Sequence, residues 1–384
     1  MTTLRVLQFI TPAGFYGAER WVLALANNID TADMICDLAV TREGDSQDLT
    51  VAEVYPELAG KVHYLPMSGR FDFRVVQQLC NIIHERGIDV IHTHGYKSDI
   101  LGLLAAKKSG IRCVSTPHGF AGKVNLKLAT FIKIGTHMLR YFDAIAPLSE
   151  ELVNDMKRMG VPTRKTRFIR NGVDLTEIDA AITGPLPSER REWGLTVGYI
   201  GQMIPRKGVA DLLSVFDALY QENPGLKLQL LGDGSQRREL ENQAGEQASA
   251  GAIEFLGFRG DRLELLSEFS LFVMTSSLEG IPRCLMEAMA VGVPVVAYDI
   301  PGVDRLIEHG KTGMLAPHGD KAALIACCRQ VLQNPELAAK LAANGRKLVE
   351  EHYSAARMAL EYKALFTELL DGGKLADSSP RETG

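Results

Sequence analysis

The feature that most constrains this chain is a repeated alternation of short apolar runs with amphipathic stretches of helical spacing. The runs lack a strict alternation of polar and apolar residues, which is typical of strands buried on both faces of a parallel sheet. The pattern predicts an α/β fold with two doubly wound domains, each a parallel sheet covered by helices. The first series comprises 4–10, 34–40, 62–66, 88–94, 111–117 and 143–149, and the second 195–201, 226–232, 252–257, 270–276 and 293–299.

A segment rich in glycine and proline, residues 171–194, interrupts this rhythm and is typical of a connection between domains. A last amphipathic stretch and a polar tail follow the second series, and we expect the tail to be disordered. The expected organisation is an N-terminal domain, a linker, a C-terminal domain, a final helix and a tail, at residues 1–175, 176–193, 194–353, 354–370 and 371–384.

Composition excludes several classes of protein. The 384 residues are 46% hydrophobic and 23% charged, which fits two globular domains and not a disordered chain. A net charge of −5 argues against nucleic acid as the main partner. The chain shows no signal-peptide pattern and no apolar run of about 18 residues, so we expect a cytoplasmic protein whose six cysteines are reduced thiols.

The chemistry is expected where strands end, because ligands of doubly wound sheets bind at the carboxyl ends of the strands. After the run 270–276 comes EGIPRCLME, which holds Glu279 and Glu287 with seven residues between them. Pro282 suits the first position of a helix, and Ile281 before it has no side chain that could cap that helix. The backbone N–H groups left free at this helix start suit an anion.

A nucleotide-sugar would use these features together. Its diphosphate would meet the N–H groups around Gly280, Ile281 and Pro282, while the two carboxylates would accept hydrogen bonds from sugar and ribose hydroxyls. For either glutamate alone, the commoner alternative is a solvated residue in a turn or on a helix surface.

A second strand end carries cations. The run 195–201 ends at Gly201, and the loop after it carries Arg206 and Lys207 before Gly208 opens a helix. Two adjacent cations beside a helix start suit a diphosphate, although a solvated basic loop is a common alternative.

The first domain offers fewer signals. Gly17 follows the first strand, but the sequence there is not G-x-G-x-x-G, which disfavours a dinucleotide site. His118 follows the run 111–117, while His92 and His94, two positions apart on a strand, are expected to point to opposite sides. With no Asp-x-Asp in the chain, we expect neither a metal site nor a cofactor.

Together these stretches resemble the retaining glycosyltransferases of family 4, which have the GT-B architecture of two Rossmann-like domains facing each other across a cleft. The resemblance covers nearly the whole chain, and the segment EGIPRCLME is its most specific part. The stretches FIRNGVD (168–174), RKGVADLL (206–213) and LLGDG (230–234) match further signatures of the family in the same order.

The resemblance implies roles in the C-terminal, nucleotide-sugar-binding domain. Glu279 would contact the donor sugar, Glu287 the nucleotide ribose, and Lys207, helped by Arg206, the diphosphate. Glu279 and Lys207 are therefore expected to be catalytic. The donor site would be completed by Gly201, Gly280, Ile281 and Pro282. One departure is Gln202, which stands where the family often has an arginine.

The N-terminal, acceptor-side domain would contribute Gly17 beside the diphosphate, His118 beside the reacting sugar as a third catalytic residue, and Asn171 to donor binding. The helix 354–370 would return to complete this domain. Tyr16 departs from the family, whose loop often has paired glycines here.

The expected function is hexosyl transfer with retention, from a UDP- or GDP-sugar to a glycan or lipid-linked acceptor, in the synthesis of cell-surface polysaccharide or lipopolysaccharide. Fixed positive charge would stabilise the leaving nucleoside diphosphate without a metal ion. Two alternatives stay open: a nucleotide-sugar epimerase of the same architecture, and a protein that binds the nucleotide-sugar without turnover.

A basic and an apolar face are expected on a helix over residues 123–142. An ordinary core-facing helix with a solvated basic face is the favoured interpretation. The alternative is peripheral contact with an anionic membrane that carries the acceptor.

Overall fold

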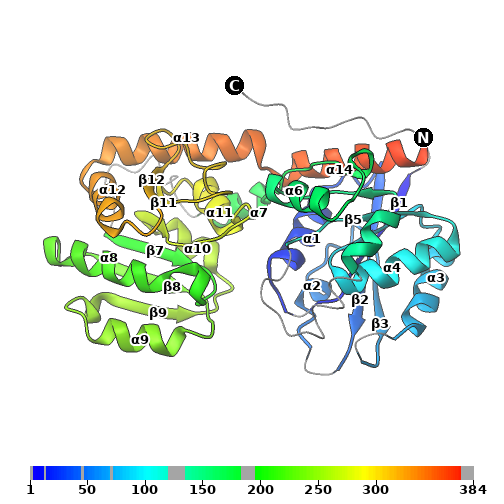
Figure 1. Cartoon of the computed structure of the whole chain (residues 1–384), viewed down its shortest axis with the longest axis horizontal. Coiled ribbons are helices and arrows are strands. Elements are labelled where there is room, and N and C mark those ends of the chain that lie inside the picture. Colours follow the sequence, from blue (N-terminus) through cyan, green and yellow to red (C-terminus); the bar gives the residue numbers. More distant parts are fainter. Residues whose placement is uncertain are drawn as a thin grey trace. The chain divides into compact units, whose positions relative to one another are not determined.

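The computed structural model describes residues 3–12, 14–44, 47–69, 72–119, 135–182 and 195–372. The chain divides into two compact units, which are coloured by sequence in Figure 1. The first unit comprises Met1–Gly172 together with Ala355–Gly384, and the second comprises Val173–Ser354. The final helix, red in Figure 1, thus belongs to the same unit as the blue N-terminal strands.

The first unit is built on a six-stranded parallel sheet with the order β3-β2-β1-β4-β5-β6. The order of the strands along the chain reverses between β1 and β4, so that these two neighbours flank the topological switch point. The strands are β1 Leu4–Ile10, β2 Met34–Arg42, β3 Val62–Pro66, β4 Val90–Thr93, β5 Arg112–Ser115 and β6 Ala144–Ile145.

The second unit repeats this topology. Its parallel strands have the order β12-β11-β10-β7-β8-β9, with the switch point between β7 and β10. Strand β12, which was not predicted, has four residues and pairs with β11 from Val296↔Met314 to Asp299↔Pro317. The strands are β7 Thr196–Ile200, β8 Lys227–Leu231, β9 Ile253–Gly257, β10 Leu271–Met274, β11 Val295–Asp299 and β12 Met314–Pro317.

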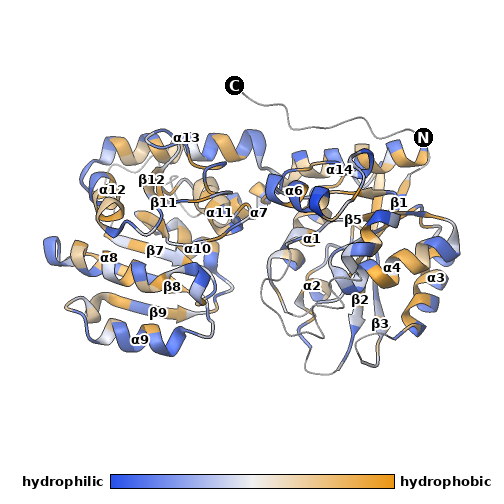
Figure 2. Ribbon diagram, in the orientation of Figure 1, coloured by the Kyte–Doolittle hydropathy of each residue, from blue (hydrophilic) through white to orange (hydrophobic). Residues whose placement is uncertain are grey.

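Helices flank both sheets. Those of the first unit are α1 Gly17–Asn27, α2 Thr50–Glu53, α3 Arg74–Arg86, α4 Tyr96–Ser109, α6 Glu150–Arg158 and α14 Ala355–Leu370. Those of the second unit are α7 Leu175–Ala181, α8 Val209–Glu222, α9 Arg237–Gly245, α10 Arg262–Ser267, α11 Arg283–Val291, α12 Lys321–Gln333 and α13 Pro335–His352. Figure 2 shows hydrophilic and hydrophobic residues side by side on α3, α8 and α9, as expected of helices with one face on a sheet and one in solvent.

The linker assignment needs correction at its start. Residues 175–181 form α7, because the Asp174 carboxylate accepts hydrogen bonds from the N–H groups of Thr176 (3.0 Å) and Glu177 (3.3 Å) and so caps the helix. Ile178 of this helix is buried in the core of the second unit. The rest of the predicted linker, 183–193, lies outside the described residues, as does most of the tail.

The helix α14 contributes to the core of the first unit. Its buried residues Met358, Tyr362 and Phe366 pack in one cluster with Leu4 and Trp21 from the start of the chain. Within the described residues, none of the helices combines the length and the hydropathy needed to cross a bilayer. The six cysteines are free thiols.

We predict that Phe366→Ala destabilises the first unit by about 3–5 kcal/mol, because it leaves a cavity at a fully buried position. Hydrogen exchange in urea should show lost protection in β1 and β4 with β7 and β10 unaffected. Leu360→Ala is the control on the same helix, since Leu360 is 67% exposed and its loss should cost little. Equal effects of both variants would contradict this role for α14.

Candidate functional site

The loops that follow β7 and β10 meet at the carboxyl edge of the second sheet. The two strands are neighbours and flank the switch point of this unit. The loop after β7 carries Arg206 and Lys207, and the loop after β10 carries Glu279. Three predicted donor-site residues, distant in sequence, are therefore brought to one place by the topology of the sheet.

Hydrogen bonds fasten these two loops together. The Thr275 hydroxyl donates to the carbonyl oxygen of Lys207 (3.1 Å), and the Ser277 N–H donates to the carbonyl oxygen of Arg206 (2.8 Å). The Arg206 guanidinium also donates from Nη1 to the carbonyl oxygen of Leu278 (3.1 Å). These hydrogen bonds join the loop after β7 to the loop after β10.

An ion pair is the centre of this site. Lys207 Nζ donates a hydrogen bond to Glu279 Oε1, and Arg206 Nη1 lies 3.6 Å from Glu279 Oε2. The side chains of Lys207 and Glu279 are only 11% and 8% exposed, so water screens their attraction weakly. Arg206 is 45% exposed and contributes less. Two cations against one carboxylate leave a net positive charge that suits an anionic ligand.

Two glycines allow close approaches of the backbone at this site. Gly208 has φ +62°, and a Cβ atom there would lie 2.2 Å from the carbonyl oxygen of Thr275. Gly302, after β11, has φ +89°, and its Cβ would lie 1.6 Å from the carbonyl oxygen of Gly280. A side chain at Gly208 would push apart the segments that hold Lys207 and Glu279, and one at Gly302 would push the loop after β11 away from Gly280.

The helix start predicted after Glu279 is present. Helix α11 begins at Arg283, one residue later than expected, and Pro282 is its N-cap without a side-chain hydrogen bond. Its first N–H groups are consequently uncapped by a side chain, as the neighbouring Ile281 and Pro282 imply. Gly201 donates its N–H to the carbonyl oxygen of Leu231 (2.9 Å), so its backbone continues the sheet.

The second glutamate of the motif has protein partners. Glu287 is buried, and its Oε1 accepts hydrogen bonds from Arg262 Nη2 (3.0 Å) and Arg283 Nε (2.9 Å). Arg262 Nη2 also reaches Glu177 Oε1 (3.2 Å). Burial alone would lower the pKa of Arg262, but the Glu287 and Glu177 carboxylates raise it above its usual value. Glu287 therefore ties α11 to α10, and Arg262 ties α10 to α7 through Glu177. The expected contact of Glu287 with ribose stays a prediction.

In the first unit, Gly17 is the first residue of α1 and a Cβ atom there would meet no atom within 4 Å. Tyr16 is the N-cap of this helix, with a side chain 56% exposed. Its N–H donates to Glu19 Oε2 (3.0 Å), and burial raises the pKa of Glu19. The open space beside Gly17 agrees with the expected approach of a ligand, which stays a prediction.

His118 follows β5 and belongs to a cluster of rings. His94 Nδ1 lies 3.2 Å from His118 Nε2, and the ring centroids of His92 and His94 are 4.4 Å apart. The expectation that His92 and His94 point to opposite sides was therefore wrong. Side chains two positions apart on a strand lie on the same face of the sheet, and the two rings keep this relation although β4 ends at Thr93. Burial lowers the pKa of His118 to about 3, which keeps its ring neutral at physiological pH.

Asn171 lies close to the boundary of the two units. Its Oδ1 accepts a hydrogen bond from the Gly172 N–H (2.8 Å), and its carbonyl oxygen accepts one from Arg357 Nη2 (3.3 Å) on α14. The side chain therefore shapes a local turn, and its expected part in donor binding stays a prediction. Residues 120–134, most of the predicted basic helix, lie outside the described residues.

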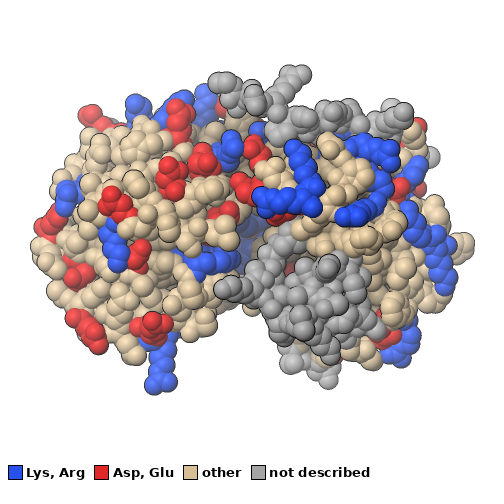
Figure 3. All heavy atoms as spheres, in the orientation of Figure 1, with Lys and Arg blue, Asp and Glu red and all other residues tan. Residues whose placement is uncertain are grey.

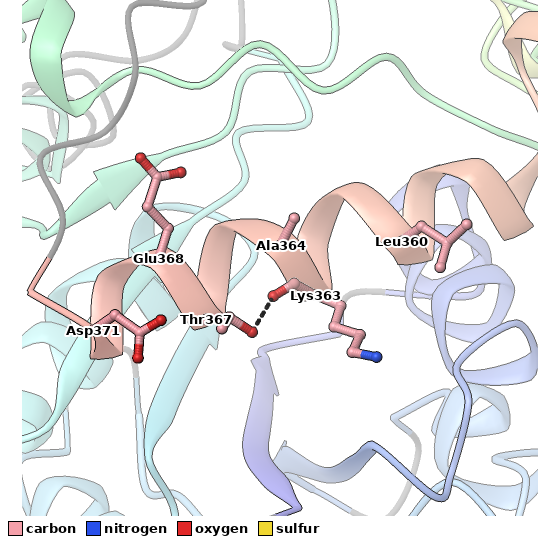
Figure 4. A pocket seen from close by; sticks show the side chains of 6 residues that line it. All are labelled: Leu360, Lys363, Ala364, Thr367, Glu368 and Asp371. Atoms are coloured by element: carbon pink, nitrogen blue, oxygen red, sulfur yellow. Dashed lines mark hydrogen bonds between the residues drawn. The ribbon is translucent and has the colours of Figure 1, made fainter. Parts of the chain in front are cut away.

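The described residues show no cluster of three or more side chains that could ligate a metal ion. On the face shown in Figure 3, acidic and basic side chains are mixed over the second unit. A hollow of about 470 Å³ is found on the outer side of α14 and is open to solvent (Figure 4). It is lined by Leu360, Lys363, Ala364, Thr367, Glu368 and Asp371, which include no predicted site residue.

Sequence reasoning missed the partners of the predicted residues. Arg262, which holds Glu287, precedes it by 25 positions in another helix, and no local pattern links the two. Gln8, which contacts His94 (2.7 Å), is a polar residue in an otherwise apolar strand. A buried polar position of this kind is the one signal that could have drawn attention to the cluster.

Comparison with known proteins finds two family models that match this chain. The model of Glycosyltransferase Family 4 matches residues 15–177, and the model of Glycosyl transferases group 1 matches residues 188–348. The N-acetyl-alpha-D-glucosaminyl L-malate synthase of Bacillus anthracis is 24% identical over 315 residues, covering 79% of this chain and 81% of that protein. The UDP-Gal:alpha-D-GlcNAc-diphosphoundecaprenol alpha-1,3-galactosyltransferase of Escherichia coli is 25% identical, covering 78% and 80%.

The fold is shared with solved structures. The crystal structure of Anabaena HepE in complex with UDP and glucose matches with a TM-score of 0.78 at 20% identity, covering 95% of this chain and all of that chain. The predicted α/β GT-B fold is confirmed. Its expected cleft stays a prediction, because each unit is described by itself.

We predict that Gly208→Ala costs about 1–3 kcal/mol of stability, because it forces a side chain into a left-handed backbone conformation. Urea unfolding followed by circular dichroism measures the loss. Gly245→Ala in α9 is the matched control, since its Cβ would meet no atom within 4 Å and alanine favours helix. A stable Gly208→Ala protein would refute the close packing of the two loops.

Glu287→Gln should destabilise the second unit by about 3–5 kcal/mol, because it leaves the largely buried Arg283 without its carboxylate and Arg262 with only the half-exposed Glu177. Glu350→Gln serves as the comparison: Glu350 is 43% exposed beside Arg346, so this change should cost less than about 1 kcal/mol. Unfolding curves of equal midpoint would show that Glu287 has no structural role.

Proposed function

We propose that this chain, which belongs to the two-domain glycosyltransferases of the GT-B fold, transfers a hexose from a UDP-sugar to a glycan or lipid-linked acceptor. Transfer proceeds with retention of the anomeric configuration and without a divalent metal ion. The proposal places the donor on the second unit and the acceptor on the first.

The observation that carries this proposal is the Lys207–Glu279 ion pair at the switch point of the second sheet. A nucleotide-sugar has an anionic part and a part rich in hydroxyl groups. Lys207 and Arg206 suit the first, and the Glu279 carboxylate suits the second. The uncapped start of α11 adds backbone N–H groups for phosphate oxygens.

Donor binding would replace the contact between Lys207 and Glu279 by contacts of each side chain with the donor. In the protein alone, Lys207 is neutralised by Glu279. A diphosphate would compete for Lys207 and Arg206, and Glu279 would then turn to sugar hydroxyl groups. As the bond between the anomeric carbon and the diphosphate breaks, negative charge grows on the leaving oxygen, where the two cations stabilise it. The same positive charge supports our proposal that no metal ion is needed.

The departing phosphate is proposed to take the proton of the attacking acceptor hydroxyl, on the face from which it leaves. One oxygen–carbon bond breaks as another forms on that face, so the configuration is retained. Support for retention comes from the resemblance of the EGIPRCLME segment to the retaining family 4 enzymes.

The donor base and the acceptor class are proposed from the relatives. The Escherichia coli relative is named for a UDP-sugar donor and a diphosphoundecaprenol-linked acceptor, and the Anabaena structure contains UDP. A lipid-linked or polysaccharide acceptor would give this enzyme a place in cell-surface glycan synthesis, on the cytoplasmic side and, through 123–142, close to the membrane.

The test is donor turnover with a panel of UDP-glucose, UDP-galactose, UDP-N-acetylglucosamine and GDP-mannose. Proton NMR follows the first sugar anomer released, with and without EDTA and with α-GlcNAc-diphosphoundecaprenol as acceptor. We expect a UDP-sugar to react, the α anomer to appear first, and EDTA to have no effect. An epimerised donor would show an epimerase, and binding without turnover would show a silent binding protein.

In this assay, Lys207→Met and Glu279→Gln should each lower kcat/KM about 100-fold or more, because each removes a group that acts on the transition state. Lys311→Met is the control, since Lys311 is 63% exposed and pairs with Glu308, which is 65% exposed. Wild-type rates in both site variants would refute the site.

A further inference from the structure

Three side chains of the first unit form a continuous hydrogen-bonded chain. Gln8 Oε1 lies 2.7 Å from His94 Nε2, and His94 Nδ1 lies 3.2 Å from His118 Nε2. Gln8 is fully buried, His94 is 5% exposed, and His118 is partly exposed. These hydrogen bonds therefore lead from the core of the unit to the carboxyl edge of its sheet, at the switch point between β1 and β4.

The side-chain amide of Gln8 determines which ring nitrogen of His94 carries a hydrogen. Its Nε2 lies 3.9 Å from Cys36 Sγ and donates there, so that Oε1 is the atom turned toward His94. A carbonyl oxygen only accepts, and His94 Nε2 must therefore carry a hydrogen. In a neutral ring, His94 Nδ1 then carries no hydrogen and can only accept a hydrogen bond. It accepts one from the N–H group at His118 Nε2.

Both rings are neutral, as this pattern requires. Burial lowers the pKa of His94 well below its usual value, and the neighbouring His92 and His118 lower it further. The ring of Trp21 packs against both, with centroid distances of 5.1 Å to His94 and 5.4 Å to His118. This packing restricts ring rotation, which would otherwise exchange the two nitrogens of each histidine.

We propose that Gln8 and His94 are positioning residues that hold His118 as the Nε2-protonated tautomer, so that its Nδ1 is presented as a hydrogen-bond acceptor. Neither residue touches the substrate. Both act through His118, and the assignment of a substrate to His118 rests on the proposed function.

The tautomer decides what His118 can meet. A bare ring nitrogen accepts a hydrogen bond from a hydroxyl group but repels an ionised phosphate oxygen, which also only accepts. His118 would therefore recognise a hydroxyl of the sugar and not the diphosphate, which leaves phosphate binding to Lys207 and Arg206. Recognition of this kind discriminates against a sugar that lacks the hydroxyl.

A second, separate chain fixes the neighbouring backbone. His92 Nε2 lies 2.8 Å from the Thr116 hydroxyl, which lies 2.7 Å from the Tyr362 hydroxyl on α14. Thr116 precedes His118 by two residues, so α14 holds the segment from which His118 extends. This chain does not reach the nitrogens of His118 and leaves its tautomer to His94.

The experiment is a two-bond ¹H–¹⁵N correlation spectrum of the histidine rings, recorded on the full-length protein without substrate. The resonances of His118, one of nine histidines, are assigned by their loss in a His118→Asn sample. We expect a protonated Nε2 and an unprotonated Nδ1 in both His94 and His118. A protonated Nδ1 on His118 in the wild type would overturn the proposal, whatever the outcome of the turnover assay.

Two variants separate positioning from support of the fold. His94→Gln offers the same acceptor to His118 and the same donor to Gln8, so His118 should keep its wild-type ¹⁵N shifts. His94→Met offers neither, and the two ¹⁵N shifts of His118 should move toward each other as the tautomers interconvert. Unchanged shifts in a folded His94→Met protein, or altered shifts in His94→Gln, would also overturn the proposal.

Discussion

The attraction between Lys207 and Glu279 depends on where two parallel strands end. Because β7 and β10 are neighbouring parallel strands, the residues that directly follow them lie side by side at the carboxyl edge of the sheet. Gly208 lets the two loops approach without a side chain between them, and the hydrogen bonds to the carbonyl oxygens of Lys207 and Arg206 join the loops. The ion pair between Lys207 and Glu279 is thus a product of the sheet topology.

The two units share one topology but fill their switch points with different chemistry. The second unit places two cations and a carboxylate there. The first places an amide and neutral imidazole rings there, packed against the indole of Trp21. An ionic edge and an uncharged edge suit the two parts of a nucleotide-sugar reaction: the charged leaving group, and the hydroxyl groups that must be recognised and oriented. Two units of the same topology therefore differ in the charge of their strand ends, and a few side chains set that difference.

Sequence alone could predict what is local. Runs of valine and leucine indicated β1 to β11, and the glycine, proline and charge pattern after β7 and β10 indicated Lys207 and Glu279 as site residues. The short β12 was not predicted, although β4, β5 and β10 are no longer. The helix α7 was missed because the glycine and prolines just after it suggested a linker. The partners Arg262 and Glu287, and the order of Gln8, His94 and His118, follow from long-range packing. The side of His94 was predicted wrongly, because residues two positions apart on a strand share a face, as the rings of His92 and His94 do.

The position of α14 in the chain has a consequence for synthesis on the ribosome. The first unit is started by the earliest residues, yet it is finished by a helix that is made after all of Val173–Ser354. During translation the second unit can complete its core while the first still exposes the apolar groove that Met358, Tyr362 and Phe366 will fill. The unit that leaves the ribosome first is therefore the one that is completed last. Until α14 is made, the first unit exposes an apolar surface to which chaperones would bind.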